Sequence, residues 1–185
     1  MEKISFDIYI PDKKRFRFTP NTIVLIIWLS LITIFGIWGE YIPSETRTYA
    51  SIIGCCITIF YIIRSLIAYA PLRGQFKGKI EFTNDAIIIN NKPYYIKGIK
   101  KIDFYFGDYY GEIRSGYRSV NPKLSQGVNN SIEFATIDDV LYNIQFKIRT
   151  PKGYFVLSPF INNALKAQKI SRFRAIDLIG EENIY

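Results

Sequence analysis

The chain contains no histidine, and only two cysteines and one methionine occur among its 185 residues. The absence of histidine excludes a histidine general base, a Ser-His-Asp triad and histidine-ligated metal sites. The two cysteines, Cys55 and Cys56, are adjacent, and such a pair rarely forms an unstrained disulfide and cannot bind zinc alone. The Asp138-Asp139 step reads as a solvated turn, and no phosphate-binding or dinucleotide-binding glycine motif occurs. We therefore expect no catalytic residue, no cofactor and no metal, in a protein that is not an enzyme.

Charged residues are missing from a long stretch near the N-terminus and are nearly missing from a second one. The first, TIVLIIWLSLITIFGIWG, covers residues 22–39, and eighteen helical residues span about 27 Å, close to the roughly 30 Å of a bilayer core. The second begins at Thr48 and holds Arg64, which can extend toward the interface if the helix continues to Tyr69 and ends before Pro71. We expect a transmembrane hairpin of two helices over residues 21–71.

Two other interpretations of these stretches are weaker. A buried hairpin of a soluble protein would show a polar stripe at the helical period, and neither stretch has one. A cleaved signal peptide would need a small-residue cleavage site after Gly39, and none follows. Trp28, Trp38 and Tyr69 lie in positions that suit an aromatic belt at a membrane interface.

Lysine and arginine are distributed unevenly around the two stretches. Only Arg47 lies in the short connection, whereas many basic residues flank the outer ends, so we expect both termini on the cytoplasmic side. With a net charge of +8, attraction to anionic headgroups is also expected. Nucleic acid is a weaker explanation, because the charge is dispersed. The residues predicted to lie at the membrane surface are Lys13, Lys14, Arg15, Arg17, Arg64, Arg73, Lys77, Lys79, Lys100 and Lys101.

The hydrophobic period changes to two after Arg73, which is typical of half-buried strands. Segments such as FKGKIEF, KKIDFYF and YNIQFKIR alternate regularly, and YFVL follows a turn at residues 150–153. We expect about seven short strands. The segment ISFDIYI, within the N-terminal residues 1–20, is a possible additional strand.

The last part of the chain changes period once more. Ser158 is a suitable N-cap, and the apolar spacing from there to Gly180 predicts one helix of about five turns. Its basic residues are expected to face away from the sheet. The expected fold class is a membrane α-helical hairpin plus an α+β domain, residues 72–185, in which a small antiparallel barrel or sandwich is closed by one C-terminal helix.

One long polar segment, FGDYYGEIRSGYRSVNPKLSQGVNNS, separates two of the predicted strands. One interpretation is a recognition loop, because tyrosine and arginine dominate interface hot spots. The other is a loop that only connects two strands, and the sequence leaves both open. The candidate partner-binding residues are Tyr109, Tyr110, Arg114, Tyr117 and Arg118.

The order of parts resembles a known family. A two-span hairpin followed by GKIEFTNDAIIINNKPYYIKGIKKIDF and a terminal helix is similar to bacterial membrane proteins with a pleckstrin-homology-like (PH-like) domain. The resemblance covers about residues 20–180, and the strand-like ISFDIYI before the hairpin departs from it. It implies a bacterial inner-membrane adaptor or scaffold that is not an enzyme and whose domain binds a protein partner, the anionic lipid surface, or both. The alternative is an inner-membrane immunity protein that binds a membrane-acting toxin. In the first case the domain holds the binding site, and in the second the spans do.

Overall fold

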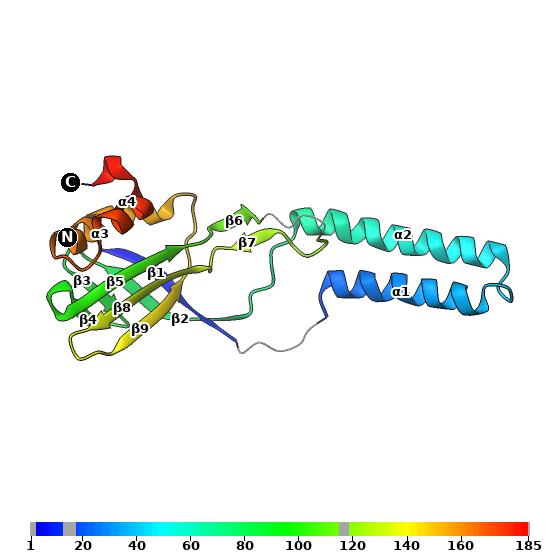
Figure 1. Ribbon diagram of the computed structural model, residues 1–185, viewed down its shortest axis with the longest axis horizontal. Helices are drawn as coiled ribbons and strands as arrows, with labels where there is room; N and C mark the ends of the chain where they lie inside the picture. Colours follow the sequence, from blue (N-terminus) through cyan, green and yellow to red (C-terminus); the bar gives the residue numbers. More distant parts are fainter. Residues whose placement is uncertain (1–2, 13–17, 115–118, 185) are drawn as a thin grey trace. The chain divides into compact units, whose positions relative to one another are not determined.

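The computed structural model describes residues 3–12, 18–114 and 119–184, and these form two compact units (Figure 1). The sheet unit comprises Met1–Asp12, Leu72–Glu112 and Ser125–Tyr185. The hairpin unit comprises Lys13–Pro71 and Ile113–Leu124. The chain therefore passes from one unit to the other four times.

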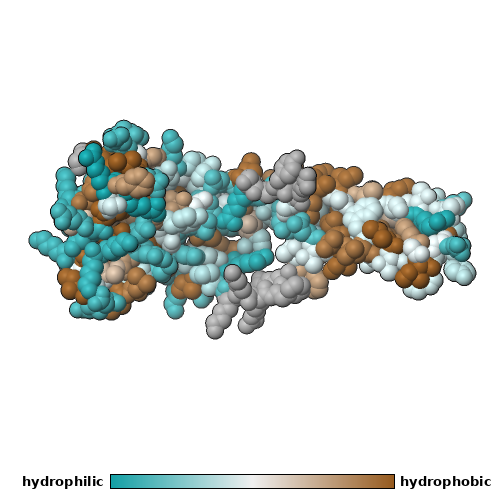
Figure 2. Space-filling model, viewed as in Figure 1, coloured by the Kyte–Doolittle hydropathy of each residue, from teal (hydrophilic) through white to brown (hydrophobic). Residues whose placement is uncertain are grey.

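The hairpin unit contains the two predicted apolar helices, α1 (Pro20–Trp38) and α2 (Ser44–Ile67). Thr19 caps α1 by accepting a hydrogen bond from the Thr22 backbone N–H, and Pro20 stands in the first turn, where no N–H is needed. No residue of α1 is buried, and Gly54 and Ser65 are the buried residues of α2. Both helices are long and apolar enough to cross a membrane. Hydrophobic side chains cover much of their visible surface in Figure 2.

A polar contact joins the two helices midway along their length. The Trp28 indole Nε1 donates to Thr58 Oγ1 at 3.0 Å, and Thr58 Oγ1 donates to the Gly54 carbonyl at 2.8 Å. Gly54 faces Leu31 and Trp28 of α1, and a Cβ atom at this position would lie 3.1 Å from Leu31 Cδ1, so a larger residue requires Leu31 to shift. Small residues at such a position let two helices approach closely in a membrane. Cys55 and Cys56 are exposed free thiols, so neither packs in this contact.

The sheet unit is built on one antiparallel sheet of seven strands, in the order β4-β3-β2-β1-β9-β8-β5. The strand β1 (Ile4–Pro11) includes the N-terminal segment predicted as a possible strand, and it lies near the centre of the sheet, paired with both β2 and β9. The two apolar helices are thus inserted in sequence between two strands, β1 and β2, that are neighbours in the sheet. The other six strands are β2 (Gly74–Phe82), β3 (Ala86–Ile89), β4 (Lys92–Tyr95), β5 (Ile99–Phe106), β8 (Asn130–Thr136) and β9 (Leu141–Phe146).

The core of the sheet unit is formed by the alternating apolar residues that the sequence places on one strand face. Five phenylalanines are fully buried there, and the rings of Phe82 and Phe160 lie 5.3 Å apart between centroids. Burying one such side chain stabilises the fold by about 1.5–3 kcal/mol. The five are Phe82, Phe104, Phe134, Phe146 and Phe160.

The C-terminal region differs from the prediction in three ways. The YFVL segment is a 3-10 turn, η2 (Gly153–Leu157), and not a strand. The expected single helix is two, α3 (Ser158–Lys166) and α4 (Arg172–Ile179), because Gln168 has a φ of 59° and the Lys169 carbonyl accepts the N–H of Ile102 on β5. Ser158 is the first residue of α3 and not its N-cap, since its hydroxyl donates to the Phe155 carbonyl. Gly180 follows α4 with a φ of 81°, as expected of a terminating glycine.

The long predicted loop contains a second, small sheet. Its two strands are β6 (Tyr110–Ile113) and β7 (Leu124–Gln126), which pair with each other. Two further 3-10 turns, η1 (Ile96–Gly98) and η3 (Glu181–Asn183), complete the described elements.

Because of Tyr9 on β1, the stability of the sheet is expected to fall at alkaline pH. Its side chain is 6% exposed, and burial raises the pKa of its phenol above the ordinary value of 10.0. The unfolded chain therefore loses this proton first as the pH rises, so the stabilisation is complete below pH 10 and is lost as the pH rises through the higher folded pKa. We expect the melting temperature in detergent to fall between pH 9 and 11, and to fall less in Tyr9→Phe. Equal pH profiles for the two proteins would contradict this prediction.

Candidate functional site

A buried polar cluster lies where the long segment leaves β5 and returns to β8. Asn130 and Ser125 are almost completely buried, and Asp108 is 8% exposed. One carboxylate oxygen of Asp108 accepts from the Ser125 hydroxyl, and the other accepts the Asn129 backbone N–H at 2.9 Å. The cluster fixes the backbone on both sides of the segment.

Asn130 is the centre of this cluster. Its Nδ2 donates to the carbonyls of Asp108 and Gly127 at 2.9 and 3.0 Å. Its Oδ1 accepts the backbone N–H groups of Gly107 and Asp108 at 3.0 and 3.3 Å. One buried amide thus bonds to four backbone groups, two of which also have a backbone partner: the Gly107 N–H donates to the Asn129 carbonyl, and the Gly127 carbonyl accepts the Ile148 N–H.

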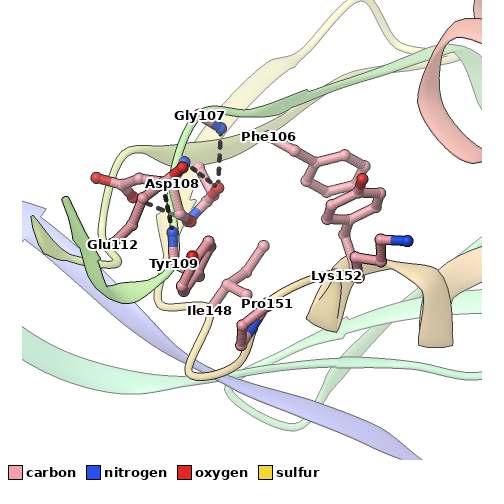
Figure 3. A pocket seen from close by; sticks show the side chains of 10 residues that line it. Phe106, Gly107, Asp108, Tyr109, Glu112, Ile148, Pro151 and Lys152 are labelled. Atoms are coloured by element: carbon pink, nitrogen blue, oxygen red, sulfur yellow. Dashed lines mark hydrogen bonds between the residues drawn. The ribbon is translucent and has the colours of Figure 1, made fainter. Parts of the chain in front are cut away.

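The cluster forms one wall of a cavity of about 330 Å³ (Figure 3). Phe106 lies on the opposite side of the view from Asp108. Its ring stacks on that of Tyr154, with 4.8 Å between the centroids. Lys152 lies at the rim, with its ammonium 5.8 Å from the ring of Phe155. The lining residues are Phe106, Gly107, Asp108, Tyr109, Glu112, Asn130, Ile148, Pro151, Lys152 and Tyr154.

The cavity is small and mainly apolar. Its volume is at the lower end of the range for small-molecule sites, and its walls are mainly apolar with a few polar groups on one side. The Glu112 carboxylate accepts the backbone N–H of Tyr109 at 3.2 Å, so it also holds the backbone of this segment in place. No group of metal-binding side chains occurs among the described residues. The cavity therefore has the size and lining to hold an apolar group between the aromatic rings and the polar wall.

Three of the five residues predicted to bind a partner lie among the described residues. Tyr109 lines the cavity, whereas Tyr110 lies under the ammonium of Lys147, 4.3 Å from its ring centroid. Arg114 belongs to the hairpin unit, where its backbone N–H donates to the Lys123 carbonyl at 2.8 Å. Tyr117 and Arg118 lie outside the described residues.

The middle of the long segment contacts the ends of the two apolar helices within the hairpin unit. Asn21 in the first turn of α1 bonds with the side chains of Ser119 and Asn121 and accepts the backbone N–H of Val120 at 2.7 Å. At the end of α2, the Ser65 carbonyl accepts the N–H of Lys123 at 3.0 Å. These bonds satisfy groups that helix ends otherwise leave without partners. Residues 119–124 are thus an ordered cap on the hairpin and not a free loop.

The residues predicted for the membrane surface are dispersed over both units. Arg64 is exposed in the last turn of α2, where a positive charge is favourable, and Arg73, Lys77 and Lys79 are exposed at or before β2. Lys100 forms an ion pair with Asp139, and Lys101 lies in a cleft beside α4. The remaining four, Lys13, Lys14, Arg15 and Arg17, lie outside the described residues.

Sequence reasoning did not find most of the cavity. Phe106 was assigned to the core, Tyr154 to a strand, and Asn130 to the end of the connecting loop. The doublet Asn129-Asn130 directly before a predicted strand is the one local signal, because asparagine side chains often bond to nearby backbone at such positions. No family model, curated protein or solved structure matches the chain. The function is therefore argued from the fold and the cavity.

Proposed function

We propose that the chain is a membrane-anchored adaptor, not an enzyme, whose cytoplasmic PH-like domain binds a protein partner. The observation that carries the proposal is the 330 Å³ cavity between the Asn130 cluster and the Phe106–Tyr154 pair. An aromatic or large aliphatic side chain of a partner fits a space of this size. Buried aromatic anchors of that kind supply much of the energy of protein interfaces.

The position of the hairpin in the chain supports the membrane part of the proposal. The Asp12 backbone N–H donates to the Arg73 carbonyl at 2.8 Å, so the two ends of the inserted segment meet at the sheet. If α1 and α2 each cross a bilayer, the start of α1 and the end of α2 must lie on the side that holds the sheet. The basic residues around the outer ends of the spans favour the cytoplasmic side. We place the protein in the bacterial inner membrane on this ground and on the family resemblance.

The sheet supports the PH-like part of the proposal. Seven antiparallel strands share one core, and the C-terminal helices α3 and α4 contribute Phe160, Ile161 and Ile179 to it. This layout is compatible with the one that the family resemblance implies. The differences are the strand β1 before the hairpin, the division of the C-terminal helix and the large insertion between β5 and β8.

A substitution at the cavity rim tests the proposal. Pro151 is exposed and lines the cavity, so Pro151→Trp adds an indole at its mouth without changing a core residue. Pro93 is exposed on the edge strand β4 and lines none of the cavities described, so Pro93→Trp is the matched control. In a pull-down from native membranes in mild detergent, we expect Pro151→Trp to reduce the amount of captured partner at least about tenfold. Pro93→Trp should capture as much as the unchanged protein.

The same pull-down distinguishes the adaptor from the alternative, an immunity protein that binds its partner through the spans. Replacing the outward-facing residues of α1 and α2 with other apolar residues leaves the cavity intact. If partner capture survives Pro151→Trp but is lost with the altered helices, the binding site lies in the spans and the adaptor proposal fails. Equal melting temperatures of all variants would show that each change acts on binding.

A further inference from the structure

A second concave surface of the sheet unit lies beside the edge strand β5, at the opposite end of that strand from Phe106. This basic cleft has a volume of about 850 Å³ and runs between the start of β5, the α3–α4 connection and the first turn of α4. Its lining residues are Lys100, Lys101, Ile102, Asp103, Leu165, Gln168, Lys169, Ile170, Ser171, Arg172, Phe173 and Arg174.

The cations of the basic cleft fall into two groups. Arg174 donates to Asp103 at 2.8 Å and also bonds with Asp177, and the bond to Asp103 raises its pKa. Lys100 pairs with Asp139. By contrast, Lys101, Lys169 and Arg172 form no ion pair with any described residue. Three uncompensated positive charges therefore line one concavity.

An exposed aromatic ring stands among these charges. Phe173 is 84% exposed, although the opposite face of α4 buries Ala175, Leu178 and Ile179 in the core. Its ring adds nothing to the packing of α4 against the sheet. Large exposed apolar side chains beside charged groups are typical of interaction surfaces.

The free edge of β5 is closed at this point. The Ile102 N–H donates to the Lys169 carbonyl at 2.9 Å, and the Arg174 guanidinium donates to the Phe104 carbonyl at 2.6 Å. A partner strand therefore has no vacant ladder to join here. Recognition at the basic cleft must use side chains, which are positive and aromatic.

We propose that the basic cleft binds an acidic segment of a protein partner, with the carboxylates facing Lys101, Lys169 and Arg172 and an apolar side chain packing on Phe173. This inference rests on the proposed adaptor function and names the chemistry of its partner. A bilayer surface is flat on the scale of a domain and touches protruding groups, whereas these cations line the walls of a concavity that a chain segment can enter. Charge complementarity thus favours an acidic peptide over anionic lipid.

A graded peptide series tests this inference on the full-length protein in phosphatidylcholine nanodiscs. Dye-labelled peptides of about twelve residues keep a fixed set of leucines, while the other positions change from glutamine to glutamate. We expect fluorescence anisotropy to show affinity that rises with glutamate content and falls with added salt. In the triple variant Lys101→Gln, Lys169→Gln, Arg172→Gln, the affinity for the most acidic peptide should fall at least about tenfold. The control Lys77→Gln, Lys79→Gln, Lys97→Gln removes the same charge elsewhere, and its affinity should fall less than about twofold.

Phe173 is tested separately from charge. Phe173→Ala should weaken binding of the most acidic peptide about tenfold, whereas Tyr95→Ala, at a 62% exposed aromatic on β4, should not. An affinity that does not depend on glutamate content, or that both triple variants reduce equally, overturns the proposal, and so does the absence of any binding.

Lipid binding is the remaining outcome, and an environment-sensitive dye detects it. The dye is attached at Phe173→Cys in a Cys55→Ser, Cys56→Ser background. A blue shift of its emission when phosphatidylglycerol replaces phosphatidylcholine would assign the cleft to the bilayer and overturn the proposal. These results do not depend on the Pro151→Trp pull-down, so failure of the basic cleft and failure of the adaptor function can be told apart.

Discussion

A fragment that begins at residue 72 will not form the seven-stranded sheet, even though it contains six of the seven strands. The missing strand, β1, lies between β2 and β9, so its loss divides the sheet and leaves two unpaired edges. It also removes Ile8 and Tyr9, which are 7% and 6% exposed. At about 1.5–3 kcal/mol for each buried side chain, plus the lost hydrogen bonds, the cost approaches the 5–15 kcal/mol stability of a typical domain.

The measurement is thermal unfolding followed by circular dichroism, with dye binding as a probe of exposed apolar surface. We expect no cooperative transition for residues 72–185. The matched control joins residues 1–12 to residues 72–185 through a two-residue Asn-Gly turn. A short turn can bridge the two ends because they already lie side by side: Pro11 pairs with Gly74, and the Asp12 N–H donates to the Arg73 carbonyl. We expect the joined protein to melt cooperatively, and equal melting of both proteins would show that β1 is dispensable.

The second large effect is expected from Asn130→Asp, a change that keeps the shape of the side chain. The substitution replaces the donor Nδ2 with an oxygen that faces the carbonyls of Asp108 and Gly127. It also places a second carboxylate near Asp108, whose Oδ1 is 3.5 Å from Nδ2. The Asp108 carbonyl loses this donor, whereas the Gly127 carbonyl still accepts the Ile148 N–H. Loss of a buried donor costs about 1–3 kcal/mol, and the new carboxylate is repelled by both carbonyls and by Asp108, so we expect the free energy of unfolding to fall by roughly 3 kcal/mol.

The neighbouring Asn129 offers a control with the same chemical change. Its side chain is exposed, and its backbone N–H, which bonds to Asp108, is unaffected by substitution. We expect Asn129→Asp to change the free energy of unfolding by less than about 0.5 kcal/mol. Denaturant titration in detergent gives both values. If the two variants lose similar stability, the effect comes from added negative charge and not from the hydrogen bonds of Asn130.

The apolar helices and the strand faces could be predicted because their signals are local. An uncharged run of helical length needs no tertiary partner to be recognised, and Ile80 and Phe82 alternate with Lys79 and Glu81 as a half-buried strand requires. The bend between α3 and α4 could not be predicted in this way. It depends on a bond between the Lys169 carbonyl and Ile102 on β5, which are far apart in sequence. The YFVL segment carries strand-like residues, but it forms a 3-10 turn that leads directly into α3.

The candidate site was harder to predict than the fold. Composition alone selected Tyr109, which does line the cavity, together with Tyr110, which instead carries a cation contact with Lys147. Phe106 and Tyr154 come together only when β5 meets the turn after β9. Asn130 acts through bonds to four backbone groups of the chain from Gly107 to Gly127, and a sequence does not show which backbone groups a side chain will contact.

The place of β1 also has a consequence for how the protein is made. This strand leaves the ribosome before either helix, but both of its neighbours in the sheet, β2 and β9, follow the helices in the chain. In the proposed topology, β1 remains unpaired in the cytoplasm until both helices have entered the bilayer. A chain that inserted only one helix would leave β1 and β2 on opposite faces of the membrane, with exposed edges that quality-control proteases can recognise. Assembly of the sheet thus serves as a check that insertion has been completed.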